Sequence, residues 1–177
     1  VVIAGESSGD IHGAKIIEHI QKENPLITFS GLGGEKMQSL GFSSLVPINL
    51  LAVMGFWEVL KKILFFLWLE KKILQSINKI KPNKIILIDY PGMNLRLAKK
   101  IKATHNIPIL YYISPQLWAW KENRVKIIQN YVDKLIVLFP FEVNWYKRFN
   151  INVKYFGHPL IDQWKKHSSN QKTSLLA

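Results

Sequence analysis

Cysteine is absent from this sequence of 177 residues, and acidic residues are few, with 12 Asp and Glu against 24 Lys and Arg. The lack of cysteine excludes a disulfide framework and a thiolate metal site. The shortage of acid leaves a formal net charge of +12, which favours an anionic partner: a nucleic acid, an anionic membrane or a phosphorylated substrate. Low-complexity tracts are also missing, and 48% of the residues are hydrophobic, so the chain can bury a core.

Short β-branched runs alternate along the chain with longer amphipathic stretches. This alternation predicts an α/β fold, a Rossmann-like parallel sheet with helices on both faces. The expected strands are 1–4, 27–31, 84–88, 109–113, 135–138 and 153–156. The expected helices lie near 11–22, 56–80, 95–105, 123–131 and 141–149.

We assign residues 1–160 to this domain and residues 161–177 to a linker with the start of a further domain. Residues 165–172 are polar, as in a linker, and residues 173–177 become apolar again. The chain opens on an apolar run without an initiator Met or a basic leader, so we expect its first residue to be a trimmed end.

The loop Gly5-Glu6-Ser7-Ser8-Gly9-Asp10 follows the first expected strand and precedes the first expected helix. Its glycines permit a tight turn, and the amino end of the helix offers free N–H groups to an anion. The loop matches neither a Walker motif nor the dinucleotide pattern G-x-G-x-x-G. Asp10 could equally cap the helix, and the pattern leaves both interpretations open.

Asp89 ends the most apolar of the expected strands. Ligands collect at the carboxyl ends of parallel strands, and apolar neighbours raise the pKa of a carboxyl group toward the range of a general base. Pro91 and Gly92 fix the turn that follows, and Asn94 can cap the next helix. A strand-end Asp is more often a turn or cap residue than a base, so both roles stay open.

The loop 114–124 combines Trp118 and Trp120 with Lys121 and Arg124. Aromatic planes bind sugar faces or acyl chains, and Arg binds phosphate through two parallel hydrogen bonds. The same mixture could bind single-stranded nucleic acid by stacking, or one Trp could simply cover the sheet edge.

Two histidines, His12 and His158, lie in or beside expected loops. Neither has a second ligand at the spacing of a metal site, so we expect no metal and assign both to ordinary hydrogen bonding.

The helix expected near 56–80 has apolar residues on more than one face. At 100° per residue its core face holds Phe56, Val59, Leu60, Ile63, Phe66, Leu67, Leu74 and Ile77. Five apolar side chains lie off this face: Trp57, Leu64, Phe65, Trp68 and Leu69.

Lysines accompany these five side chains, with seven Lys and two Glu between residues 57 and 84. Charged residues interrupt the apolar run before the ~20 residues that a spanning helix needs. We therefore predict that these five side chains associate with an anionic membrane surface. A partner domain or a second subunit that covers them is the alternative.

Six motifs, in this order, resemble those of the lipid-A-disaccharide synthase family. They are Gly5-Glu6-Ser7-Ser8-Gly9-Asp10, Leu51-Ala52-Val53-Met54-Gly55, Asp89-x-Pro91-x-x-Asn94, Ser114-Pro115-x-x-Trp118-Ala119-Trp120, Phe139-Pro140-Phe141-Glu142 and Gly157-His158-Pro159. Each motif is weak alone, but together they cover nearly the whole chain. One departure is Met93, which stands where the family usually has Phe.

The resemblance implies a glycosyltransferase of the GT-B fold, with two Rossmann-like domains and no metal or other cofactor. Such an enzyme joins UDP-2,3-diacylglucosamine to 2,3-diacylglucosamine 1-phosphate and releases UDP, making the disaccharide of lipid A for lipopolysaccharide. It works as a peripheral protein on the cytoplasmic side of the inner membrane. The resemblance makes Asp89 the catalytic base. It implies substrate contacts from Gly5, Glu6, Ser7, Ser8, Gly9, Asp10, Asn94, Ser114, Trp118, Arg124 and His158.

The expected partners are an acylated sugar phosphate acceptor and an anionic membrane surface. Since members of the family are roughly twice as long, we expect the UDP-sugar donor to bind only in the full-length protein and this chain alone to be inactive. A nucleic-acid-binding domain is a rival hypothesis that we do not favour, because Arg is scarce beside Lys and an apolar helix has no use on a phosphate backbone. A noncatalytic partner-binding module is the third hypothesis.

Overall fold

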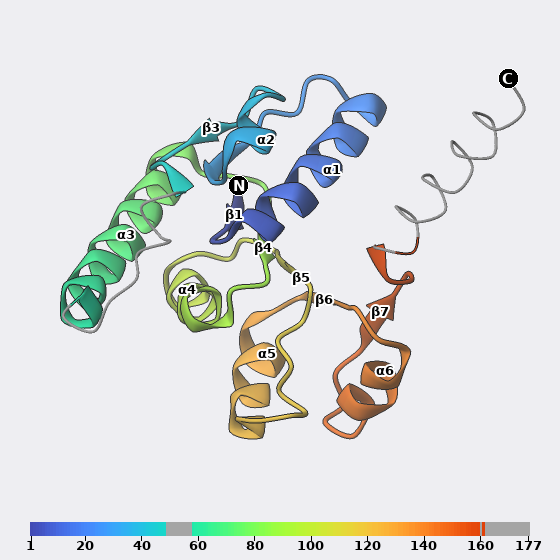
Figure 1. Cartoon of the computed structure of the whole chain (residues 1–177). Helices are drawn as coiled ribbons and strands as arrows, with labels where there is room; N and C mark the ends of the chain where they lie inside the picture. Colours follow the sequence, from blue (N-terminus) through green and yellow to red (C-terminus); the bar gives the residue numbers. More distant parts are fainter. Residues whose placement is uncertain (49–57, 160, 162–177) are drawn as a thin grey trace, which may run out of the picture.

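The computed structural model describes residues 1–48, 58–159 and 161, with side chains from residue 63 onward in the long third helix (Figure 1). One parallel sheet runs through it in the order β3-β2-β1-β4-β5-β6-β7. The strands are β1 (Val2–Ala4), β2 (Ser30–Leu32), β3 (Ser43–Ser44), β4 (Ile85–Ile88), β5 (Ile109–Tyr112), β6 (Lys134–Val137) and β7 (Val153–Tyr155). The helices are α1 (Ser7–Glu23), α2 (Glu35–Gln38), α3 (Glu58–Ile80), α4 (Pro91–Thr104), α5 (Val125–Tyr131), which follows the 3₁₀ turn η2 (Glu122–Arg124), and α6 (Pro140–Lys147).

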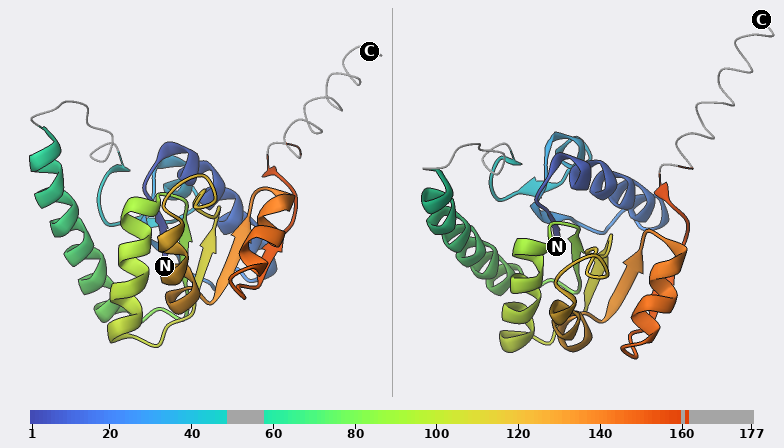
Figure 2. Two further views of the ribbon diagram at one scale, coloured as in Figure 1. Left: turned by 90° about the horizontal axis from the view of Figure 1, so that it is seen from below. Right: turned by 60° about the horizontal axis from the view of Figure 1, so that its bottom comes forward.

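Helices cover both faces of this sheet, so the predicted Rossmann-like fold is confirmed (Figures 1 and 2). All four side chains of β4 are buried. Because alternate side chains of a strand point to opposite faces, the sheet is covered on both faces at this strand. Ile85 and Leu87 pack with residues of α3, α4 and α5, whereas Ile86 and Ile88 pack with residues of α1 and α2. The continuous isoleucine-rich run is therefore the mark of a strand buried from both sides.

The strand order reverses between β1 and β4, which lie side by side with Ala4 opposite Ile88. From β1 the chain goes on to β2 and β3 at one edge, and from β4 it goes on to β5, β6 and β7 at the other. At such a reversal the loops leaving two neighbouring strands separate, and a crevice opens at their carboxyl ends. The loops that leave β1 and β4 begin at Gly5 and Asp89, two of the predicted site positions.

The buried face of helix α3 matches the predicted one only in part: Ile77 is buried and Phe66 and Leu74 pack against the core, as predicted, but the face is rotated from the predicted one. Leu69, Ile73 and Ile77 are buried, whereas Ile63 and Leu67, expected in the core, are 53% and 50% exposed. The prediction that Leu69 faces the membrane is therefore wrong.

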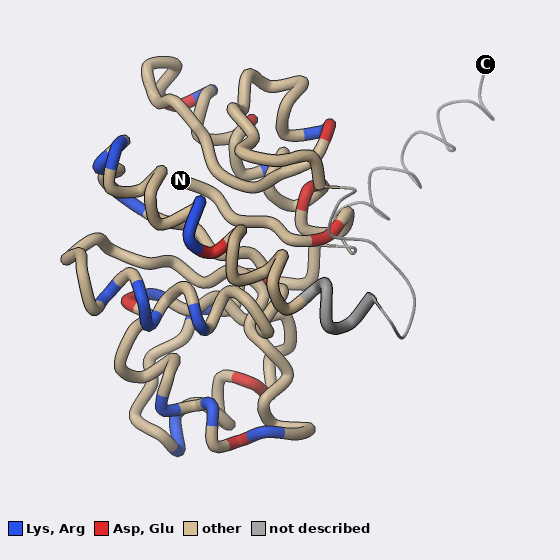
Figure 3. The backbone as a smooth tube through the Cα atoms, turned by 90° about the vertical axis from the view of Figure 1, so that its left-hand side faces the viewer, with Lys and Arg blue, Asp and Glu red and all other residues tan. Residues whose placement is uncertain are grey.

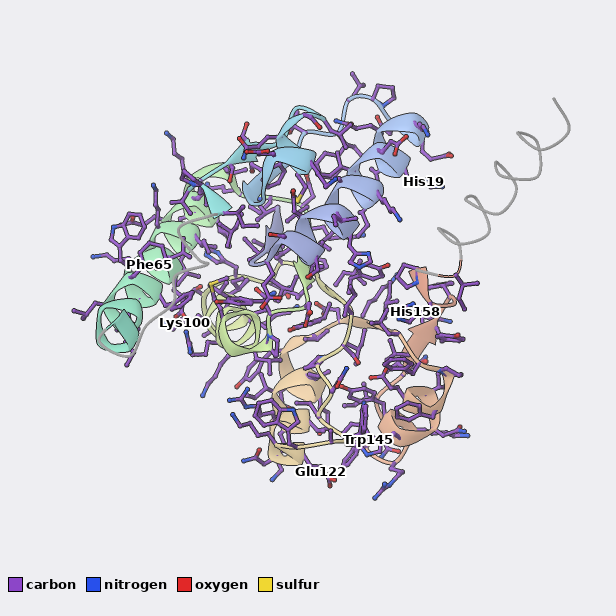
Figure 4. The ribbon with its side chains drawn as sticks, viewed as in Figure 1. His19, Phe65, Lys100, Glu122, Trp145 and His158 are labelled. Carbon is purple, nitrogen blue, oxygen red and sulfur yellow. The ribbon has the colours of Figure 1, made fainter. Side chains whose placement is uncertain are left out.

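A buried carboxylate on the observed inner face of α3 is paired with two cations of α4. The carboxylate of Glu70 is fully buried and accepts hydrogen bonds from Arg96 Nε at 2.7 Å and Lys100 Nζ at 2.6 Å, both on α4. Figure 4 shows Lys100 on α4, next to α3. A pattern that counts only apolar residues cannot predict a buried glutamate. The predicted core face of α3 therefore was rotated relative to the observed one.

Several predicted features lie outside the described residues. They include Trp57, the motif 51–55 and residues 162–177 of the proposed linker. Within the residues that the structure describes, no helix is long and apolar enough to cross a membrane.

Candidate active site

Two hollows open at the carboxyl edge of the sheet. The larger, of about 620 Å³, lies where the loops after β1, β2 and β3 meet, and we name it the Asp10 hollow. The smaller, of about 260 Å³, lies among the loops after β4, β5 and β6, and we name it the Asp89 hollow. The lining of the Asp89 hollow consists of Asp89, Pro91, Ile113, Ser114, Pro115, Gln116, Trp120, Leu138, Phe139 and Glu142.

Asp89 stands at the end of the central strand in a conformation that few residues other than Gly adopt. Its φ is 45°, and the φ of Tyr90 is 48°, so two consecutive residues are left-handed. The carboxyl group is half-buried, and this burial raises its pKa, although the N–H of Tyr90 acts in the opposite direction. A carboxyl group with a raised pKa in a hollow has the properties of a general base.

The backbone of Asp89 is held from three directions. Its N–H donates to Tyr112 O at 3.0 Å. Its carbonyl oxygen accepts from the hydroxyl of Tyr111 and from Asn94 Nδ2, each at 2.7 Å. These contacts use the peptide groups and leave the carboxylate at the hollow.

Asn94 supports this turn from below. It is fully buried, and its Nδ2 also donates to Ile88 O at 3.1 Å. Its side chain does not cap α4, whose first turn follows Tyr90 without a side-chain cap. The prediction of a helix cap is wrong, and a substrate contact from Asn94 would require this buried amide to become accessible.

Asp10 caps a helix, but not the helix to which it belongs. Its Oδ1 accepts from the N–H groups of Gly34 at 2.8 Å and Met37 at 3.1 Å, and its Oδ2 accepts from Lys36 N at 3.0 Å. These amides form the amino end of α2. With both carboxylate oxygens already bonded, Asp10 holds α2 against α1, and the structure gives no support to its predicted contact with substrate.

The remaining residues of the first loop divide into two groups. Gly5 and Gly9 are buried, and a Cβ atom at Gly5 would lie 2.5 Å from the ring of Tyr90. Glu6, Ser7 and Ser8 are exposed at the amino end of α1. Gly5 therefore lets the Asp89 turn pack against the first loop, and of the three polar residues Ser7 lines the Asp10 hollow.

Ser114 is hydrogen-bonded to the carboxylate of Glu142, which the sequence analysis did not predict as a site residue. Its hydroxyl donates to Glu142 Oε1 at 2.7 Å, and both residues are buried. Glu142 Oε2 accepts from the N–H groups of Leu138 and Phe139 at 3.0 and 2.9 Å. A glutamate three residues into a helix that bonds back to the cap N–H is one half of a capping box, and this spacing was readable in Phe139-Pro140-Phe141-Glu142.

Four aromatic rings form a row that includes Phe139 of the Asp89 hollow. Trp118 meets Phe141 at 5.0 Å between ring centroids, Phe141 stacks on Phe139 at 5.7 Å, and Phe139 meets His158 at 5.7 Å. Trp118 and Phe141 are 38% and 47% exposed, so their faces are open to a ligand. The row is built from the loops after β5, β6 and β7, as the predicted positions of Trp118 and His158 required.

Arg124 and His12 lie on other elements than this row. Arg124 is half-buried at the end of η2. His12 lies on α1, where burial lowers its pKa and the charges of Lys15 and His158 add to the effect. His12 Nδ1 is buried without a hydrogen-bond partner, so the expected ordinary hydrogen bonding does not extend to that atom. Among the described residues there is no group of three His, Cys, Asp or Glu that could hold a metal ion.

Comparison with known proteins assigns this chain to a family. The family model described as Lipid-A-disaccharide synthetase matches residues 1–176. The "Lipid-A-disaccharide synthase" of Syntrophus aciditrophicus (strain SB) is 39% identical over 173 residues, which is 98% of this chain and 45% of that protein. That of Trichlorobacter lovleyi is 43% identical over 166 residues, 92% of this chain and 42% of the relative.

A third relative, the "Lipid-A-disaccharide synthase" of Hydrogenovibrio crunogenus, is 40% identical over 178 residues, 98% of this chain and 47% of that protein. The chain thus spans less than half the length of each of these curated relatives. On the family match and on these identities, the chain belongs to the lipid-A-disaccharide synthase family.

Proposed function

We propose that this chain supplies the general base and the acceptor-side loops of a glycosyltransferase of lipid A biosynthesis. The reaction transfers 2,3-diacylglucosamine from its UDP form to 2,3-diacylglucosamine 1-phosphate and releases UDP. The observation that carries the proposal is Asp89, a half-buried carboxyl group of raised pKa at the reversal of strand order. Its position matches the site that this fold favours for ligands.

The chemistry requires one proton transfer on this side of the reaction. The 6-hydroxyl of the acceptor sugar loses its proton as its oxygen attacks the anomeric carbon of the donor. Asp89 accepts that proton, and UDP departs as an anion that needs no strong acid. Trp120 lines the Asp89 hollow, and Trp118 and Phe141 on neighbouring loops are partly exposed, so these rings suit a sugar ring and its acyl chains.

Membrane association is the second part of the proposal, and it rests on one face of α3. Leu64 and Trp68 are 71% and 48% exposed, and Ile63 and Leu67 beside them are half exposed. Lys71 and Lys72 follow within one turn, and Lys72 Nζ lies 5.0 Å from the ring centroid of Trp68. Figure 3 views the molecule from this side and shows Lys and Arg along its helices.

Apolar side chains beside lysines suit the interface of an anionic bilayer. Acylated substrates reside in a membrane, so an enzyme that uses them gains from lying on its surface. We therefore place the complete protein on the cytoplasmic face of the inner membrane, with Leu64 and Trp68 toward the lipid, whereas Phe65 is half-buried and packs against the core. Leu69 is buried and does not belong to this surface.

A vesicle-binding experiment tests this surface. The double variant Leu64→Ser and Trp68→Ser removes two exposed apolar side chains, each of which contributes about 1.5–3 kcal/mol when buried in lipid, so binding to anionic vesicles should weaken by more than about tenfold. Leu26→Ser is the matched control, because Leu26 is 90% exposed in the turn after α1. Equal vesicle binding by the double variant and the control would contradict the proposal.

The reaction itself is tested in a chain extended to the full length of the family. Mass spectrometry should detect the acylated disaccharide 1-phosphate only when the donor and the acceptor are both present. Release of UDP at the same rate without the acceptor would show a hydrolase instead, and the proposal would be wrong.

A further inference from the structure

We propose that Tyr111 is a positioning residue, whose hydroxyl group holds the Asp89 peptide in the orientation that presents the carboxylate to the acceptor. The inference rests on the proposed role of Asp89 as general base. It assigns a function to a buried tyrosine that no motif of the sequence includes.

The Asp89 turn needs support because of its backbone conformation. Asp89 and Tyr90 have φ values of 45° and 48°, and neither is Gly. Residues with side chains adopt this region rarely, and they persist there only where the surrounding structure fixes them. This backbone conformation sets the direction in which Cβ of Asp89 leaves the chain, and so helps to direct the carboxylate.

Tyr111 provides that support across the sheet. It lies on β5, opposite Leu87 of β4, and its hydroxyl reaches the carbonyl oxygen of Asp89 at 2.7 Å. The side chain is fully buried. Its ring is therefore fixed by packing, and the hydroxyl bonds at the one point where the chain turns from strand to helix.

The protonation state of Tyr111 keeps this bond in place. Burial raises the pKa of its hydroxyl well above the ordinary value, the charge of Asp89 raises it further, and Arg124 acts in the opposite direction. The phenol is therefore protonated at neutral pH and donates to the Asp89 carbonyl. Ionisation of Asp89 raises the pKa of the Tyr111 hydroxyl further, so it does not break this hydrogen bond.

The bond serves the turn more than the fold as a whole. The same carbonyl oxygen also accepts from Asn94 Nδ2 at 2.7 Å, so it keeps a partner when the hydroxyl is removed. Phe in place of Tyr111 fills the same space in the core. What changes is the freedom of the Asp89 peptide, and with it the place and the hydration of the carboxylate.

The variant Tyr111→Phe, made in the full-length enzyme, tests the inference. We expect kcat to fall by about 10–100-fold, since small misplacements of reacting groups have effects of this size, while KM for the acceptor stays within about twofold. The acidic limb of the kcat/KM profile should move to lower pH, because a more hydrated Asp89 has a lower pKa. Tyr131→Phe on α5, half-buried and outside the Asp89 hollow, is the matched control and should keep wild-type values.

A double-mutant cycle separates this inference from the proposed function. In an Asp89→Asn background, Tyr111→Phe should have no further effect on kcat, because it acts only through Asp89. If Asp89→Asn itself keeps wild-type turnover, the proposed base is wrong and the inference falls with it. If Asp89→Asn is inactive but Tyr111→Phe keeps wild-type kcat and an unmoved acidic limb, only the positioning role is wrong.

A second variant guards against misfolding. Asn94→Ala removes the other donor to the same carbonyl and should reproduce the fall in kcat and the shift of the acidic limb. Should both variants fail to fold, as judged by circular dichroism, the two bonds serve the fold itself and the positioning role is overturned.

Discussion

Asp10 and Asp89 have similar places in the sequence, but the structure surrounds their two carboxyl groups differently. Each follows a buried strand on one side of the strand reversal, and each lines a hollow at the carboxyl edge of the sheet. The carboxylate of Asp10 accepts three backbone N–H groups at 2.8–3.1 Å. In Asp89 the strong contacts go instead to the peptide carbonyl, and burial raises the pKa of the carboxyl group.

The difference distinguishes an acid that supports the fold, Asp10, from the acid proposed as the base, Asp89. Both carboxylate oxygens of Asp10 are occupied by amide donors of α2, so this side chain supports the fold. A carboxylate whose backbone is fixed while its oxygens remain at a hollow can still accept a proton. Asp10 lines the larger hollow, and Asp89, the proposed base, lines the smaller one.

Asp89→Asn should have the largest effect of any change at this edge. In the full-length enzyme, turnover should fall by about 10²–10⁴-fold, the usual contribution of a general base. Stability near neutral pH should not decrease. The folded pKa of Asp89 lies above its unfolded value, so its contribution to stability is complete below the unfolded pKa and is lost as the pH rises through the folded one. A steady-state assay and a thermal melt measure both quantities, and a less stable variant with normal turnover would reverse the comparison.

Asp10→Ala should show the opposite pattern. Three amide groups at the start of α2 lose their acceptor, and each buried donor left unpaired costs about 1–3 kcal/mol, so we expect the free energy of unfolding to fall by about 3 kcal/mol. Denaturant titration measures this loss. Turnover per folded molecule should change by less than about tenfold. A loss of turnover as large as that of Asp89→Asn, with stability intact, would return Asp10 to the predicted group of substrate-binding residues.

Glu70 extends the comparison to an acid that is buried completely. It is paired with Arg96 and Lys100, which are themselves about half exposed. Replacing both cations with Met would leave a buried charge without a partner and should cost about 2 kcal/mol after allowance for solvent screening. Replacing Glu70 with Met leaves the cations free to reach water and should cost less. Denaturant midpoints of the two variants decide between them, and the reverse order would show that the pair does not fix α3.

Ser114→Ala should have the smallest effect. It removes one hydrogen bond to Glu142, which is worth about 1 kcal/mol, and Glu142 keeps its bonds to two N–H groups. KM for the acceptor should rise by less than about threefold. An increase of more than about tenfold at unchanged stability would show that the Ser114 hydroxyl binds substrate, as the sequence predicted.

The sequence predicted those parts of the molecule that depend on local pattern. Apolar runs such as 85–88 identified the central strands, and the position of Asp89 at the end of such a run identified the candidate base. The short elements α2 and β3 were missed because four and two residues carry no measurable periodicity. The stability of α2 comes from Asp10, which lies far away in the sequence.

The other errors involve hydrogen bonds and ion pairs that a pattern of apolar residues does not contain. The buried face of α3 includes Glu70, which is paired with cations on α4, and an apolar stripe contains no information about an ion pair. In the same way, nothing in the local pattern around Asn94 distinguishes a helix cap from an amide that bonds back to the preceding strand. Tyr111 belongs to no motif because its contact with Asp89 exists only when β4 and β5 lie side by side.

Titration of the aspartate carboxyl groups tests the central claim most directly. NMR of the chain labelled with ¹³C-aspartate follows each carboxyl group, and Asp89→Asn assigns the Asp89 signal. Asp133 is an internal reference: burial would raise its pKa, but hydrogen bonds from the Ile109 N–H and from Lys102 outweigh this and lower it. We predict that Asp133 titrates below the ordinary value for aspartate, about 3.9, and Asp89 above it. An Asp89 signal that titrates with Asp133 or below it would contradict the account, because its surroundings would then stabilise the charge of the carboxylate instead of preparing it to accept a proton.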